Sequence, residues 1–168
     1  MRAVLALALL LCFAPPALAL DGASLEAGRG EENTDLWRLG LQWKWDKRWW
    51  DAGGWHLGAY WDLQLGQWNN GRDYWDLSLT PVFRYERSSG AVRPYVEGAI
   101  GFHFLSDLRI TSRKLFSTRF QFGDHLGAGV RFGRHDVSVR IQHLSNGGIA
   151  RPNPGINFAV LRYQLHFD

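Results

Sequence analysis

Apolar and polar side chains alternate with a period of two residues through most of this chain of 168 residues. In the segment 37–45 every odd position is Trp or Leu, and the even positions are Arg38, Gly40, Gln42 and Lys44. Because successive side chains of a β-strand point to opposite faces of the sheet, this period predicts strands with one apolar face. The pattern occurs eight times, in the segments 23–28, 37–45, 55–66, 75–86, 92–104, 119–132, 136–141 and 159–167.

Two all-β architectures fit this alternation. A soluble sandwich or lipocalin-like barrel would bury the apolar faces inside, whereas a membrane barrel would turn them outward into lipid. Several alternations run for about nine residues or more, the length that a tilted strand needs to cross a bilayer. The polar faces carry charges of both signs that can pair inside a small closed barrel, namely Glu26, Arg38, Asp62, Arg84, Glu86, Glu97, Arg119, Arg131, Arg140 and Arg162.

The predicted connections differ in length at the two ends of the strands. Short turns on the periplasmic side and longer outer loops are typical of outer-membrane barrels, whose closure leaves no unpaired sheet edge in lipid. We therefore predict an eight-stranded antiparallel transmembrane β-barrel in the outer membrane of a Gram-negative bacterium. The short connections are expected at 51–54, 88–90 and 133–135, and the longer ones at 68–72, 105–116 and 146–156.

The first 19 residues have the pattern of a secretory signal peptide. Arg2 precedes a short apolar stretch and two prolines, and Ala19 ends a small-x-small cleavage site. We therefore expect residues 1–19 to be removed and residues 20–168 to form the barrel. The one cysteine, Cys12, would leave with the signal peptide, so neither a disulfide nor a thiolate metal site is expected. The net charge of +3 is too small to indicate a nucleic-acid partner.

All nine tryptophans lie between residues 37 and 75. Indole rings favour the membrane–water interface, so we expect strands two to four to carry the tryptophans of the aromatic girdles. A barrel of about eight strands is filled with side chains, so a pore is not expected and any activity must lie at an end or on the outer wall. The tryptophans on the predicted lipid-facing sides are Trp37, Trp43, Trp45, Trp55, Trp61 and Trp75.

Three polar residues fall on the predicted outer wall near a long loop. His143 and Ser145 continue the lipid-facing side of the seventh strand, and Asn157 shares the lipid-facing register of the eighth. A serine hydroxyl needs an adjacent base, and a third group that orients the histidine would complete a triad. The backbone N–H groups of Asn146 and Gly148 are candidates for an oxyanion hole.

The alternative interpretation is that these residues have no catalytic role. A histidine near the rim of a barrel is often only an interfacial residue, and serine is common in any loop. Placement favours catalysis, because a polar pair on a lipid wall is costly unless its groups satisfy each other.

The stretch His143-Leu144-Ser145-Asn146-Gly147-Gly148, followed by Pro152-Asn153-Pro154-Gly155 and a final strand, resembles the lipid A 3-O-deacylases of the PagL type. The resemblance implies an outer-membrane serine esterase that removes the acyl chain ester-linked at position 3 of lipid A. It implies His143 as general base, Ser145 as nucleophile, and Asn146 and Gly148 near the oxyanion. It implies no metal and no cofactor, and lipopolysaccharide of the outer leaflet as the partner.

The chain departs from the family at one position. The third member of the family's triad is a glutamate fourteen residues after the histidine, and that position here is Asn157. An amide can accept the imidazole N–H but supplies no charge, and an acid-to-amide change in a serine triad can cost about 10⁴ in rate. Either the enzyme is slow or another acid substitutes. Candidate acids are Glu31, Glu32 and Asp35, because strands one and eight are neighbours in a closed barrel.

Two other functions stay open. Asn157 favours a catalytically weak or inactive structural or lipid-binding barrel. A host-surface interaction barrel would bind a partner through its outer loops, which are modest in length here. A homodimer is also left open. Cationic residues of the outer loops would either meet lipid A phosphates or be solvated charges, and these are Arg109, Arg113, Lys114 and Arg151.

Overall fold

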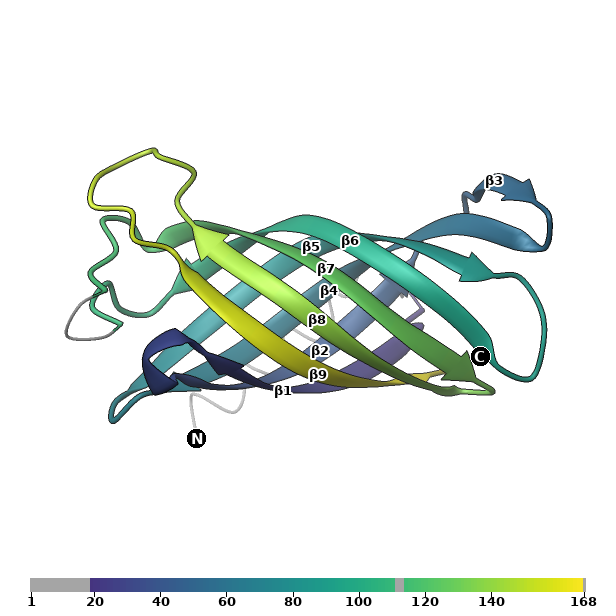
Figure 1. Cartoon of the computed structure of the whole chain (residues 1–168), viewed down its shortest axis with the longest axis horizontal. Coiled ribbons are helices and arrows are strands. Elements are labelled where there is room, and N and C mark those ends of the chain that lie inside the picture. Colours follow the sequence, from purple (N-terminus) through teal and green to yellow (C-terminus); the bar gives the residue numbers. More distant parts are fainter. Residues whose placement is uncertain (1–18, 111–113, 168) are drawn as a thin grey trace, which may run out of the picture.

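The computed structural model describes residues 19–110 and 114–167. The predicted signal peptide, apart from Ala19, and Arg113 lie outside the described residues. The described chain forms one closed sheet with an elongated, tilted-strand barrel shape (Figure 1). Its long strands are β1 (Gly22–Gly30), β2 (Asp35–Lys44), β4 (Trp55–Asn69), β5 (Asp73–Arg87), β6 (Arg93–Leu105), β7 (Phe120–Phe132), β8 (His135–Ser145) and β9 (Ile156–His166).

Every neighbouring pair of these strands is antiparallel. The order runs β2-β1-β9-β8-β7-β6-β5-β4, and pairing of β2 with β4 closes the ring. Strand β1 lies between β2 and β9, so the first and last strands of the barrel are neighbours. The predicted eight-stranded antiparallel barrel is confirmed for the described residues.

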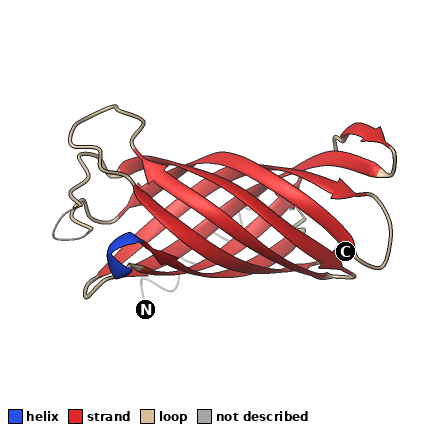
Figure 2. Ribbon diagram, in the orientation of Figure 1, coloured by secondary structure: helices blue, strands red, loops and turns tan. Residues whose placement is uncertain are grey.

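Two connections differ from the sequence-based expectation. The predicted turn at 51–54 is the tip of a small hairpin, because the four-residue strand β3 (Trp49–Ala52) pairs with the start of β4 outside the ring (Figure 2). The connection expected to be long at 68–72 is only the tight turn at 70–72. There Asn69 and Asp73 face each other, and Asn69 Nδ2 donates to Asp73 Oδ1 at 2.6 Å.

Two long connections, 106–119 and 146–155, lie at the same end of the barrel as the short 3-10 helix η1 (Glu31–Asn33), as Figure 1 shows. We call this the loop end, and the opposite end, with the connections 88–92 and 133–134, the turn end. In the described segments, no helix is long and apolar enough to cross a membrane.

The outer wall of the barrel is apolar. Leu126 is 75% exposed and Ile141 is 73% exposed, although both lie in mid-strand. Exposed Trp37 and Trp75 lie on β2 and β5 toward the loop end, and Trp45 packs on Trp61 near the turn end. This arrangement suits a lipid-facing surface, because apolar side chains gain nothing from exposure to water.

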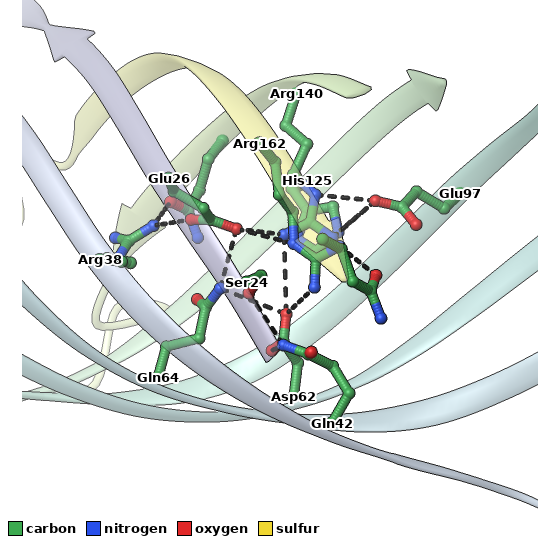
Figure 3. Close-up of polar contacts among 12 residues, drawn as sticks. Ser24, Glu26, Arg38, Gln42, Asp62, Gln64, Glu97, His125, Arg140 and Arg162 are labelled. Carbon is green, nitrogen blue, oxygen red and sulfur yellow. Dashed lines mark hydrogen bonds and ion pairs between the residues drawn. The ribbon is translucent and has the colours of Figure 1, made fainter. Parts of the chain in front are cut away.

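The interior carries the charges that the alternation placed on the polar faces, except that of Arg119, which precedes the start of β7 and is exposed. The carboxylate of Glu26 lies among three guanidinium groups, those of Arg38, Arg140 and Arg162 (Figure 3). Arg140 also contacts Glu97, which in turn pairs with Arg84. Because a buried charged side chain is tolerated only when it is paired, this network explains how the interior of a small barrel accommodates so many charged side chains.

An apolar cluster fills the barrel at the loop end. The alternation predicted polar side chains on the inner faces of the strands, so this cluster is a departure from it. Trp68 and Phe158 pack with ring centroids 4.9 Å apart. Leu144 and Ile156 belong to the same cluster and are fully buried. Because neighbouring side chains on a strand face opposite ways, burial of Leu144 holds His143 and Ser145 on the outer wall. The cluster consists of Leu36, Trp68, Tyr74, Leu105, Ile110, Phe116, Leu144, Ile156, Phe158 and Val160.

Candidate active site

His143 and Asn157 lie directly opposite each other on β8 and β9. His143 Nδ1 lies 2.8 Å from Asn157 Oδ1. An amide oxygen only accepts hydrogen bonds, so Nδ1 must be the donor and must carry a proton. In the neutral imidazole the other nitrogen, Nε2, is then unprotonated and has the lone pair that a general base requires.

Ser145 follows His143 by two residues and shares its outward side of β8. Both side chains are half-buried at the loop end of the wall. The Ser145 hydroxyl accepts a long hydrogen bond of 3.5 Å from the N–H of Gly147, and the hydrogen bonds of the described residues include none between Ser145 and His143. Nucleophile–base contacts commonly tighten only when substrate binds, so this spacing is compatible with a resting site.

The backbone N–H groups of Asn146 and Gly148 are already engaged in the loop. Asn146 N–H donates to Asn153 Oδ1 at 3.0 Å, and Gly148 N–H donates to Asn146 Oδ1 at 2.9 Å. The buried Asn146 amide also donates to Ser117 Oγ at 2.8 Å. The two predicted oxyanion donors thus shape the loop, and the N–H directed at the serine is that of Gly147.

A chain of contacts continues from Asn157 to the other loops. Asn157 Nδ2 donates to Glu31 Oε1 at 2.6 Å. The other oxygen of Glu31 pairs with the ammonium group of Lys114, which also donates to the Gly155 carbonyl at 2.8 Å. Hydrogen bonds from Lys114 and Asn157 hold the pKa of the Glu31 carboxyl below its usual value, so it is ionised at neutral pH.

The other two candidate acids do not make this contact. Glu32 is exposed, with a backbone φ of 52°. Asp35 forms an ion pair with Arg29 on the rim. Of the three acids that the sequence offered, the structure brings Glu31 to the site.

Gly155 packs against the imidazole. A Cβ atom at this position would lie 2.6 Å from His143 Cε1 and 3.2 Å from its Nε2, and the backbone φ is +62°. Only glycine accepts both the left-handed conformation and this close approach without strain.

The predicted phosphate-binding cations differ in their surroundings. Lys114 is held by Glu31 and Gly155, whereas Arg109 and Arg151 are exposed on the two long loops. In the part of the chain that the structure describes, no group of three or more His, Cys, Asp or Glu side chains is arranged to hold a metal ion.

Comparison with known proteins decides the family. The family model described as lipid A 3-O-deacylase (PagL) matches residues 35–166, which include every residue of the candidate site except Glu31. The chain belongs to the PagL family. It is 35% identical over 153 residues to the lipid A deacylase PagL of Pseudomonas aeruginosa PAO1, covering 89% of this chain and 87% of that protein. It is also 35% identical over 94 residues to the lipid A deacylase PagL of Bordetella bronchiseptica RB50, covering 55% of this chain and 51% of that protein.

Solved structures agree with this membership. A crystal structure of the outer membrane enzyme PagL superimposes with a TM-score of 0.81 at 34% identity, covering 86% of this chain and 98% of that one. The N-terminal β-barrel domain of Pseudomonas aeruginosa OprF gives a TM-score of 0.53 at 14% identity, covering 88% of this chain and 98% of that domain, and so supports the fold alone. This PagL-family chain is an outer-membrane barrel. Such barrels place their short turns in the periplasm and their longer loops outside the cell, so we expect the loop end to face the cell exterior.

Two site features of this PagL-family chain escaped sequence reasoning. The role of Gly155 depends on how the 146–155 loop folds back on His143, which no strand period reports. Lys114 was a candidate for phosphate binding, but its ammonium group contacts Glu31 and the loop backbone. The one signal available in the sequence was that Lys114 is a basic residue of one outer loop and Glu31 is an acidic residue of another.

Proposed function

We propose that this chain is a serine esterase that hydrolyses the ester-linked acyl chain at position 3 of lipid A in the outer leaflet. One observation carries the proposal: His143, Ser145 and Asn157 gather on the lipid-facing wall, just below the loops. A buried triad inside the barrel could not reach a membrane lipid, whereas this wall is in contact with the lipid. The family supports lipid A as the substrate.

The mechanism follows from the roles of these groups. Ser145 Oγ attacks the ester carbonyl carbon while His143 Nε2 accepts the hydroxyl proton. The N–H of Gly147, already directed at Oγ, is placed to donate to the developing oxyanion. Collapse breaks the bond between the acyl carbon and the sugar oxygen, which takes the proton from His143. Water then hydrolyses the acyl-serine by the same steps and releases the fatty acid.

The flanking residues take supporting roles in this proposal. Asn157 holds the imidazole by accepting its Nδ1–H, and Asn146 and Gly148 keep the 146–155 loop in shape. Exposed Arg109 and Arg151 are available to the lipid A phosphates as hydrogen-bond donors. One barrel contains the whole proposed site, so the mechanism does not require a homodimer. We also retain residues 1–19 as a signal peptide, which the N-terminal mass of the exported protein would test.

The test is the lipid A of a Gram-negative host that expresses the protein. With the wild type we expect lipid A to lose the mass of one 3-linked acyl chain, and with Ser145→Ala we expect no loss. Ser89→Ala, in an exposed turn-end connection, is the matched control and should behave as the wild type. Unchanged lipid A with both the wild type and Asn157→Glu would refute the proposal.

A second candidate function rests on Asn157. With an amide at the position of the triad acid, a lipid-binding barrel without turnover would have the same fold and outer wall. Binding of lipid A by purified wild type, with no acyl release by either the wild type or Asn157→Glu, would favour this alternative.

A further inference from the structure

The amide of Asn157 has two different ends, and the structure gives each end a different partner. Its Oδ1 faces His143 Nδ1 at 2.8 Å, and its Nδ2 donates to Glu31 Oε1 at 2.6 Å. The two partners come from different elements, β8 and the 3-10 helix η1, and meet at Asn157 because β9 lies between β8 and β1.

The carboxylate determines which way the amide points. An ionised carboxylate only accepts hydrogen bonds, so it selects the Nδ2 end of Asn157 and directs Oδ1 toward His143. With Oδ1 toward the ring, Nδ1 must carry the imidazole proton and Nε2 must be free. If the amide turned over, Nδ2 would donate to Nδ1 and the proton would move to Nε2, which is the wrong tautomer for a base that serves Ser145.

Several contacts hold Glu31 in this position. Its second carboxylate oxygen pairs with Lys114, whose ammonium group is anchored to the Gly155 carbonyl at 2.8 Å. The turn that carries Glu31 is closed by Gly30 N–H donating to the Thr34 carbonyl at 2.7 Å. Although the Glu31 side chain is 39% exposed, it is therefore held from two directions.

We propose that Glu31 is a positioning residue of this site, whose carboxylate orients the Asn157 amide and thereby sets the tautomer of His143. Its negative charge, one side chain removed from the imidazole, also favours the imidazolium that forms when Ser145 gives up its proton. The inference rests on the proposed esterase function. It also accounts for how a PagL-family chain with an amide at the acid position retains a carboxylate in the relay.

The test compares kcat for lipid A deacylation among folded, purified variants. Glu31→Gln should lower kcat about tenfold. Glutamine is both a donor and an acceptor, so it can bond either end of the Asn157 amide, and it carries no charge to favour the imidazolium. Glu32→Gln, the exposed neighbour in the same turn, is the control and should leave kcat unchanged. Glu31→Asp, which keeps the charge but shortens the side chain, should fall between the wild type and Glu31→Gln.

An exchange variant separates positioning from a structural role. Glu31→Gln combined with Asn157→Glu inverts the order of amide and carboxylate and puts the charge directly on His143, so kcat should return to the wild-type value or exceed it. With a carboxylate at position 157 there is no amide to orient, so Glu31→Gln should have little effect in the Asn157→Glu background. If Glu31 served only to tie the loops together through Lys114, Glu31→Gln would slow the Asn157→Glu variant as much as it slows the wild type, and this result would overturn the inference. A wild-type kcat in Glu31→Gln would also overturn it while leaving the esterase proposal intact.

A second measurement does not depend on turnover. The ¹⁵N chemical shifts of the His143 ring report which nitrogen carries the proton. We expect a protonated Nδ1 and a free Nε2 in the wild type, and a mixture of tautomers in Glu31→Gln. Identical shifts in the two proteins would contradict the positioning role. The activity of Ser145→Ala tests the esterase proposal alone, because the His143 shifts do not depend on turnover.

Discussion

Replacing Gly155 by alanine should disable the site through the position of one ring. The added Cβ would lie 2.6 Å from His143 Cε1, whereas carbon atoms in ordinary contact are about 3.5 Å apart, so the imidazole must move by about 1 Å. A misplacement of about 1 Å can cost about 10² in rate. The φ of +62° adds a backbone strain of about 1–2 kcal/mol for any residue with a Cβ.

The assay is kcat for lipid A deacylation by purified Gly155→Ala in detergent, with the free energy of unfolding measured in parallel. The matched control is Gly133→Ala in a turn-end connection, where φ is +55° and a Cβ would meet nothing within 4 Å. We expect both variants to lose about 1–2 kcal/mol of stability and only Gly155→Ala to lose about 10² in kcat. The reasoning would be refuted by a wild-type kcat in Gly155→Ala, or by an equal loss of kcat in Gly133→Ala.

Two further predictions concern the barrel that carries the site. Leu126→Arg on the outer wall, where the leucine is 75% exposed, should destabilise the protein in bilayers by about 2–4 kcal/mol; Ile149→Arg in the outer loop, 64% exposed, should cost little. Equal unfolding free energies for the two variants in lipid would contradict the lipid-facing assignment. Glu97→Ala in the interior should cost about 3–5 kcal/mol, because it leaves Arg84 and Arg140 without a shared carboxylate. A urea titration in which Glu97→Ala matches the exposed control Glu32→Ala would count against a stabilising interior network.

The features predictable from the sequence are those that a period of two residues reports. The alternation around Arg38 and Arg140 separates a charged interior from an apolar wall, and the same parity puts His143 and Ser145 outside. Counting back from the last strand also places Asn157 on that wall, although the pairing of His143 with Asn157 depends on the hairpin register.

The rest depends on loop conformation and on contacts between distant segments. The apolar cluster at the loop end interrupts the polar interior, because Trp68 and Phe158 pack against each other inside the barrel beneath the loops. Three acids of the first loop were equivalent in the sequence. Glu31 alone reaches Asn157, because left-handed backbone at Glu32 and Asn33 turns the chain after it. Such a turn cannot be inferred from hydrophobic periodicity.

The central claim is that Ser145, activated by His143, is the nucleophile. A fluorophosphonate forms a covalent adduct with an activated serine hydroxyl, with loss of fluoride, and peptide mass spectrometry locates the adduct. We predict an adduct on the peptide that contains Ser145 in the wild type, and none on that peptide in His143→Ala. A protein that releases acyl chains from lipid A but carries no adduct on Ser145 would contradict the claim.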